Sequence, residues 1–177
     1  MPALMRSHRK TARPGEAERF EQEKVLVKDT STDFACAFDD SHYYAKDLLI
    51  VVARPDARAP FSLRALAGLL NSKLLKFYYR TTFQTVHVQN GELASLPLPL
   101  VDGHSRQEAF GELDAAVEKR IRAERERREA ETERDKEFWA RRCRELDEHI
   151  DELVYRLYLV DKGAQQVVAG VMDAIGP

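Results

Sequence analysis

Residues 69–99 hold the side chains whose types and spacing could do chemistry. The stretch starts as an apolar helix, turns basic and aromatic at Lys73, Lys76, Tyr78, Tyr79 and Arg80, and continues in a polar, β-prone segment. Tyrosines at helical spacing are common in packing, and cations near a helix C-terminus interact favourably with the helix macrodipole without any ligand. These residues alone therefore leave binding and packing both open.

No catalytic constellation accompanies this stretch. The sequence has no glycine-rich phosphate loop, no GxSxG elbow, no HExxH and no Cys/His set with zinc spacing. The motif of an acidic residue or asparagine, two prolines and an aromatic residue that adenine and cytosine methyltransferases carry is also missing. Asp56 lacks the further acidic and lysine residues of a nuclease site, and the five histidines are scattered. We therefore predict no catalytic residue, no metal site, no cofactor and a chain that is not an enzyme by itself.

Charge and composition narrow the classes of protein to which the chain can belong. The 177 residues carry a formal net charge of −2, whereas a domain that neutralises many phosphates is usually strongly basic. Any nucleic-acid surface must therefore be local. Cys36 and Cys143 lie far apart without CxxC spacing, which favours a reduced chain. With no signal-peptide core and no apolar run long enough to span a membrane, we expect a soluble cytoplasmic protein.

Residues 20–54 show the patterns of β-structure. Val25 and Val27 alternate with polar neighbours, and Phe34, Cys36 and Phe38 share one face at period two, so that a hairpin is predicted. Turn-forming residues fill positions 29–33 between the two strands. The continuous apolar run 48–53 predicts a strand that is buried on both faces.

The next elements mix helix and strand signals. Ser62 is a candidate N-cap, and apolar residues at spacings of three and four predict one amphipathic helix that ends near Arg80. After it, alternation around Val86 and Val88 and the turn signal at residues 90–91 predict one or two short strands.

From about residue 105 the sequence becomes helical and highly charged. Apolar residues keep a heptad-like spacing over 110–121 and again over 138–157, while almost nothing between 122 and 137 is apolar. A helix without an apolar face has only weak i,i+4 ion pairs of its own. We therefore expect the helix to bridge two packed ends, although the sequence leaves open whether it is continuous or folds back. The tail predicts a short final helix.

The expected fold class is α+β. A small mixed β-sheet packs on an amphipathic helix, and a long charged helix or helical hairpin and a short C-terminal helix follow. The domains expected from composition are a flexible basic lead-in (1–19), an α/β domain (20–104), a helical spacer with coiled-coil character (105–161) and a helical tail (162–177).

Three phrases, in order, resemble one known family. They are "FEQEKVLVKDTSTDFACAFDDSHYYAKDLLIVVA", "ALAGLLNSKLLKFYYR" with the later "ELASLPLPL", and "LDEHIDELVYRLYLVD". This order is similar to the TaqI-like C-terminal specificity domain of type IIG restriction-modification enzymes and related N6-adenine DNA methyltransferases. Type I specificity subunits are similar in layout, with a recognition domain followed by a long helical spacer. In the last phrase Leu159 stands where the family often has glycine.

The resemblance implies a DNA target recognition domain in a restriction-modification or phage-defence system. Cations at the helix end would face phosphates, and amide side chains could pair with adenine edges while Arg80 pairs with guanine. The partners would be double-stranded DNA and a methyltransferase or endonuclease catalytic domain or subunit. The candidate DNA-binding residues are Lys73, Lys76, Tyr79, Arg80, Thr82, Gln84, His87, Gln89 and Asn90.

Two alternatives stay open. In the first, the chain is a helical interaction scaffold whose heptad segments pair with a partner or with a second copy. In the second, it is a fragment of a larger methyltransferase that has no function alone. Two further basic residues, Lys28 and Lys46, and their neighbours His42 and Tyr43 could equally reach DNA or solvent.

Overall fold

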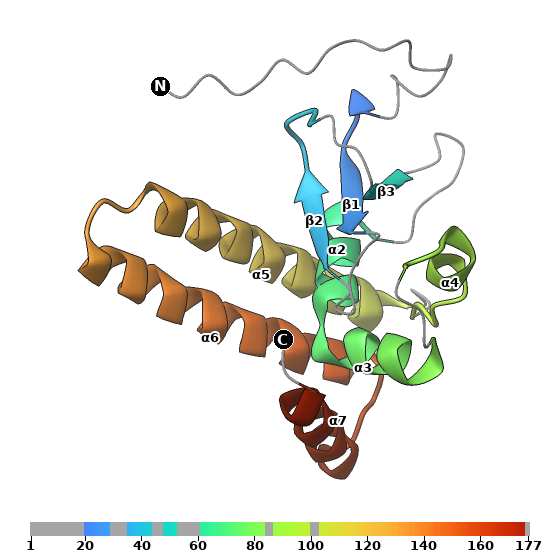
Figure 1. The fold of residues 1–177 in the computed structure, drawn as a ribbon. Coiled ribbons are helices and arrows are strands. Elements are labelled where there is room, and N and C mark those ends of the chain that lie inside the picture. Colours follow the sequence, from blue (N-terminus) through green and yellow to red (C-terminus); the bar gives the residue numbers. More distant parts are fainter. Residues whose placement is uncertain are drawn as a thin grey trace.

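The computed structural model describes residues 20–28, 35–43, 48–52, 61–83, 87–99 and 103–175. A three-stranded sheet and the helices α2 to α4 form a head, two long antiparallel helices form an arm, and α7 packs against α3 (Figure 1). The α+β class is confirmed. The elements are β1 Lys24–Lys28, β2 Cys36–Asp39, β3 Leu48–Val52, α2 Leu63–Asn71, α3 Lys73–Thr82, α4 Asn90–Ala94, α5 His104–Glu129, α6 Glu133–Leu157 and α7 Lys162–Ile175.

The sheet has the order β2-β1-β3. β1 pairs antiparallel with β2, with Val25 opposite Phe38 and Val27 opposite Cys36, so the hairpin is confirmed. The predicted turn at 29–33 and Phe34 lie outside the described residues. β3 also pairs antiparallel with β1. The described strands therefore form an antiparallel sheet, whereas a mixed sheet was expected. The prediction that β3 is buried on both faces stays a prediction, because its side chains lie outside the described part of the chain.

The predicted single helix 63–80 is wrong, because the chain forms two helices that meet at Ser72. The backbone of Ser72 is extended, with φ −64° and ψ 149°. Its hydroxyl donates to the carbonyl of Leu69 at 2.6 Å and accepts from the N–H of Leu75 at 3.3 Å. The serine side chain thus bonds to the end of α2 and the start of α3, which is how such residues compete with a continuous helix. Ser62 is confirmed as the N-cap of α2, accepting from Ala65 N–H at 2.9 Å.

The side chain of Asn71 joins this helix break to the sheet. Its Oδ1 accepts from the backbone N–H of Cys36 at 3.0 Å, and its Nδ2 donates to the carbonyl of the same residue at 2.8 Å. Cys36 opens β2, so both backbone groups at that strand end are satisfied by one amide. This amide therefore links the C-terminus of α2 to the first residue of β2.

The charged helical region folds back as a hairpin, the second of the two forms that the sequence allowed. The charged segment 122–137 lies between two packed stretches, with Ile121 against the main core and Trp139 against a smaller cluster in the arm. α6 begins after Thr132, whose side chain accepts from the N–H of Asp135 at 3.1 Å. The charged segment forms the far end of the arm, where ion pairs such as Lys136 with Glu133 lie along one helix. Most of the heptad residues pack between α5, α6 and the head, but Phe138 is 50% exposed.

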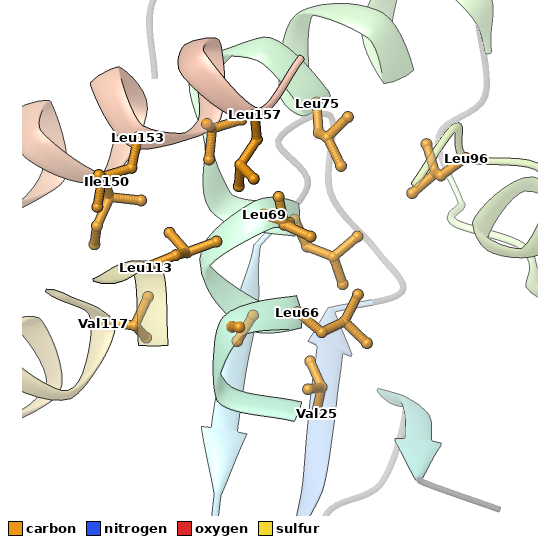
Figure 2. Close-up of a cluster of buried hydrophobic side chains, with 14 of the residues drawn as sticks. Val25, Leu66, Leu69, Leu75, Leu96, Leu113, Val117, Ile150, Leu153 and Leu157 are labelled. Atoms are coloured by element: carbon orange, nitrogen blue, oxygen red, sulfur yellow. The ribbon is translucent and has the colours of Figure 1, made fainter. Parts of the chain in front are cut away.

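The main core lies where the arm meets the head. Leu113 and Val117 from α5 and Ile150 and Leu153 from α6 converge on α2, whose Leu69 faces them (Figure 2). The strand residues Val25 and Val27 close the other side of α2. A second, small cluster in the arm contains Ala123, Cys143 and Leu146, with Trp139 packed against it. α2 is therefore the central element through which the sheet and the arm contact each other.

Just after the end of α6, one residue adopts an unfavourable backbone conformation. Leu159 has φ 54°, a left-handed conformation that costs most L-residues about 1–2 kcal/mol relative to glycine. Its side chain is 81% exposed. The position where the family phrase often has glycine is thus a left-handed helix end, and here a leucine occupies it.

Candidate nucleic-acid interface

The first two candidate cations lie at the start of α3, beside the arm. Lys73 donates its backbone N–H to Asp151 Oδ1 at 2.8 Å, and its Nζ lies 3.9 Å from Asp151 Oδ2. Asp151 belongs to α6, so a carboxylate from a distant helix occupies the N-terminus of α3, where the macrodipole favours negative charge. Lys76 lies one turn further along α3. Both lysines line an open groove between β2, α3 and the arm.

The structure places Tyr79 in the core, which corrects its assignment as a DNA-contacting residue. Its side chain is only 2% exposed. The phenol donates to Glu92 at 2.6 Å, and the same carboxylate accepts from the backbone N–H of Gln89 at 2.9 Å. These hydrogen bonds tie α3 to α4. Tyr79 therefore positions this surface rather than forming part of it.

The remaining described candidates lie at the other end of α3. Thr82, His87, Gln89 and Asn90 are exposed, and Arg80 is half-buried. Gln84 lies outside the described residues. The turn predicted at residues 90–91 is wrong, because Gln89 closes a capping box and α4 begins at Asn90. Of the predicted strands, 84–86 lie outside the described part, and 88–99 contain no strand.

The predicted site therefore divides into two surfaces at opposite ends of α3. We call the exposed residues Thr82, His87, Gln89 and Asn90 the α3–α4 surface, and the groove that holds Lys73 and Lys76 the arm groove. α3 has ten residues, which at 1.5 Å per residue corresponds to about 15 Å. Lys73 and Thr82, the two ends of this helix, are thus separated by less than one turn of duplex DNA, which is about 34 Å.

Two carboxylates that sequence reasoning missed organise this region. Glu92 connects α3 to α4, and Asp151 connects α3 to the arm. The capping-box pattern of Gln89 with Glu92 three residues later was a readable signal. No local signal pointed to Asp151, because its partner Lys73 lies 78 residues away in the sequence.

Asp151 makes the stability of this junction depend on pH. Burial raises the pKa of the Asp151 carboxyl to about 6, although the N–H and charge of Lys73 oppose the shift. An acid whose pKa is higher in the folded than in the unfolded chain favours folding in its protonated form. Its contribution is therefore present at low pH and is lost as the pH rises from the unfolded value near 4 through about 6.

We predict that Asp151→Asn abolishes this dependence, because asparagine keeps an acceptor for the N–H of Lys73 without a titrating charge. Free energies of unfolding should be measured for both proteins between pH 4 and pH 7. The wild type is expected to lose stability relative to the variant across this range. Parallel curves would contradict the assigned role of the Asp151 carboxyl.

The described residues contain no group of three or more His, Cys, Asp and Glu side chains that could hold a metal ion. None of the helices in the described ranges is long and apolar enough to cross a membrane.

The geometry defines a class: an α+β head with an exposed polar surface at one end of α3, joined to a charged helical arm. The family model of the TaqI-like C-terminal specificity domain matches residues 4–98, so the chain belongs to this family. The match covers the strands and α2 to α4 and ends before α5. No curated protein and no solved structure shows a significant match to the chain.

Proposed function

We propose that this protein is a sequence-specific DNA recognition module of a restriction-modification or phage-defence system. The observation that carries the proposal is the family match over residues 4–98, because it covers the head and both ends of α3. The module would bind duplex DNA and position a separate adenine methyltransferase or endonuclease, as a type IIG enzyme does within one chain. It would act in the cytoplasm, without catalysis of its own.

The chemistry of the α3–α4 surface supports this proposal. Amides such as Gln89 and Asn90 can form paired hydrogen bonds to adenine, and Thr82 and His87 can add single ones. The core contact of Tyr79 and its bond to Glu92 hold these side chains on a fixed scaffold. A fixed scaffold matters because sequence is read only by side chains placed in register with base edges.

Selection from a randomised duplex library tests the proposal. Purified full-length chain should enrich one short motif, and the preference over random DNA should persist at near-physiological salt. We expect Asn90→Ala to relax the preference at one base pair by about 1–3 kcal/mol. Arg80→Ala and Gln84→Ala test the flanking positions in the same way.

The control is Gln166→Ala, which removes an exposed amide from α7, away from the α3–α4 surface. This variant should keep the affinity and the motif of the wild type. Absence of any enriched motif at low salt would refute DNA recognition by the chain on its own. Loss of the motif in the Gln166 variant would locate the readout elsewhere.

The fold offers less support for a helical scaffold. That alternative needs heptad residues that are available to a partner, but Leu113, Leu146, Ile150 and Leu153 are buried within this chain. Pairing between α5 and α6 already fills the seam that a coiled-coil partner would occupy.

A further inference from the structure

We propose that the arm groove binds the phosphate backbone of the recognised duplex, so that the arm takes part in DNA binding together with the head. This inference rests on the proposed function and extends it to α5 and α6, which lie beyond the family match. The partner is one strand of duplex DNA, contacted without regard to sequence.

The arm groove is large and open. Its volume is about 1130 Å³, and its walls come from β2, α2, α3, α5, α6 and α7. Tyr43, which follows β2, stands at the groove with 55% of its surface exposed. Two hydrogen bonds, from the N–H groups of Ser41 and Tyr43 to Asp39, fix this short turn at 3.0 Å each. These bonds hold the turn that carries Tyr43 against the end of β2.

The groove has more positive than negative side chains, in contrast to the chain as a whole. Six lysines and arginines line it against four acidic residues, while the full chain has a net charge of −2. The cations are Lys73, Lys76, Arg120, Arg125, Arg127 and Arg128. The local excess is what a phosphate-binding surface needs in a protein that is not basic overall.

Most of the acidic groups in the groove are already engaged. Glu124 accepts from Arg127 at 2.8 Å and from Arg128 at 3.2 Å, and these arginines lower the pKa of its carboxyl to about 2. Asp147 accepts from Arg120 at 2.8 Å. A single ionised carboxylate thus contacts three guanidinium groups at the groove, since Arg120 Nη1 also lies 3.4 Å from Glu124. Planar guanidinium groups that are held in advance lose less freedom when they bind phosphate.

Two further cations of the groove have no carboxylate partner within the described residues. Lys76 on α3 and Arg125 on α5 make no ion pair in the part of the chain that the structure describes. They line the same groove from its two walls, one in the head and one in the arm. A polyanion that passes along the groove would meet both. The α3–α4 surface begins at Thr82, the last residue of the helix that carries Lys76, so one duplex could reach base-reading and phosphate-binding groups together.

The test is the salt dependence of binding by full-length Lys76→Gln/Arg125→Gln. Affinity should be measured from 50 to 300 mM salt for the selected motif and for a random duplex. Each phosphate contact contributes about 0.9 to the slope of log affinity against log salt, so the double variant should lose about 1.8. At 0.15 M salt the affinity for both duplexes should fall about 30-fold on the same basis.

A matched control removes the same charge outside the groove. Lys119→Gln/Arg144→Gln changes two exposed cations of the arm that do not line the groove. It should leave the slope within about 0.5 of the wild type, since distant exposed charges are screened at these salt concentrations. Circular dichroism and thermal unfolding establish that both double variants fold.

The outcomes separate the two proposals. Specific binding by the wild type, with a lower slope in the groove variant alone, supports the phosphate site. Specific binding with equal slopes in the groove and control variants overturns the groove and leaves the recognition function intact. If the groove variant instead keeps its overall affinity but loses its preference for the motif, the groove takes part in sequence readout. That result also overturns the proposal of a sequence-blind phosphate contact. A wild type that binds no duplex at 50 mM salt overturns both.

Discussion

Asp39→Ala is expected to lower the free energy of unfolding by about 3–5 kcal/mol, the usual cost of removing one partner from a buried ion pair. The partner is Lys24, whose side chain is completely buried. Its ammonium pairs with Asp39 across the β1–β2 register and donates to the carbonyl of Phe20 at 2.9 Å. Without the carboxylate, a buried cation keeps only a neutral acceptor.

Asp40→Ala is the control, because Asp40 is the neighbouring residue of the same type but is exposed. It should change stability by no more than about 0.5 kcal/mol. Denaturant unfolding followed by circular dichroism measures both variants. An Asp39→Ala protein as stable as Asp40→Ala would show that the ammonium of Lys24 reaches water by a small rearrangement of the hairpin.

A double variant separates the charge from the turn. Lys24→Met/Asp39→Leu removes both charges, and replacing a buried ion pair by apolar residues is often neutral or stabilising. Asp39, however, also accepts from two backbone N–H groups of the turn that follows it. We therefore expect the double variant to recover most, but not all, of the lost stability.

The hairpin illustrates what alternation in the sequence can and cannot predict. Period-two patterns located β1 and β2 because one face of each strand packs on a helix. The pairing of Lys24 with Asp39 could not be predicted, since it depends on register, and a shift of one residue would move both side chains to other neighbours. A lysine inside a strand pattern reads as exposed unless its partner is known.

The break between α2 and α3 and the turn of the arm also could not be predicted from apolar spacing alone. Apolar spacing predicted helix on both sides of Ser72, but the serine bonds to backbone groups of both helices and Asp151 occupies the new N-terminus. The turn of the arm did have a local signal: Thr132 precedes Asp135 by three residues, as in a helix start. The long run of helix-forming residues concealed it.

For the candidate site, the sequence could suggest residues but not how they are arranged. Tyr79 lies four residues after the buried Leu75 and so on the same helical face, a spacing that already favoured the core. The separation of Lys76 from Thr82 into different surfaces could not be read from the sequence. It depends on the arm, which folds back and brings α5 and α6 against the start of α3.

Leu113→Ala tests the contact between arm and head, with an expected loss of about 2–5 kcal/mol in the free energy of unfolding. Leu113 is fully buried, and it faces α2 where Gly68 leaves no side chain in the way (Figure 2). A Cβ at Gly68 would lie 2.4 Å from Val117 Cγ2 and 3.4 Å from Leu113 Cδ1. The two helices are therefore so close that neither added nor removed volume is easily absorbed.

Gly68→Ala should for this reason also destabilise, by about 1–3 kcal/mol through overpacking. Adding Val117→Ala to this variant should restore part of the loss by making room for the new methyl group. Leu159→Ala serves as the control for Leu113→Ala, since it truncates a leucine that is 81% exposed and keeps a Cβ at the left-handed position. Its effect should stay near 0.5 kcal/mol or below.

Unfolding of Leu113→Ala should be followed by two signals, because Trp139 is the only tryptophan and lies in the arm. Fluorescence then reports on the arm, while circular dichroism reports on all helices and strands. If α2 joins arm and head into one cooperative unit, the two transitions coincide and shift together. An earlier fluorescence transition would show that the arm unfolds by itself, and the groove between arm and head would then lose one wall before the head unfolds.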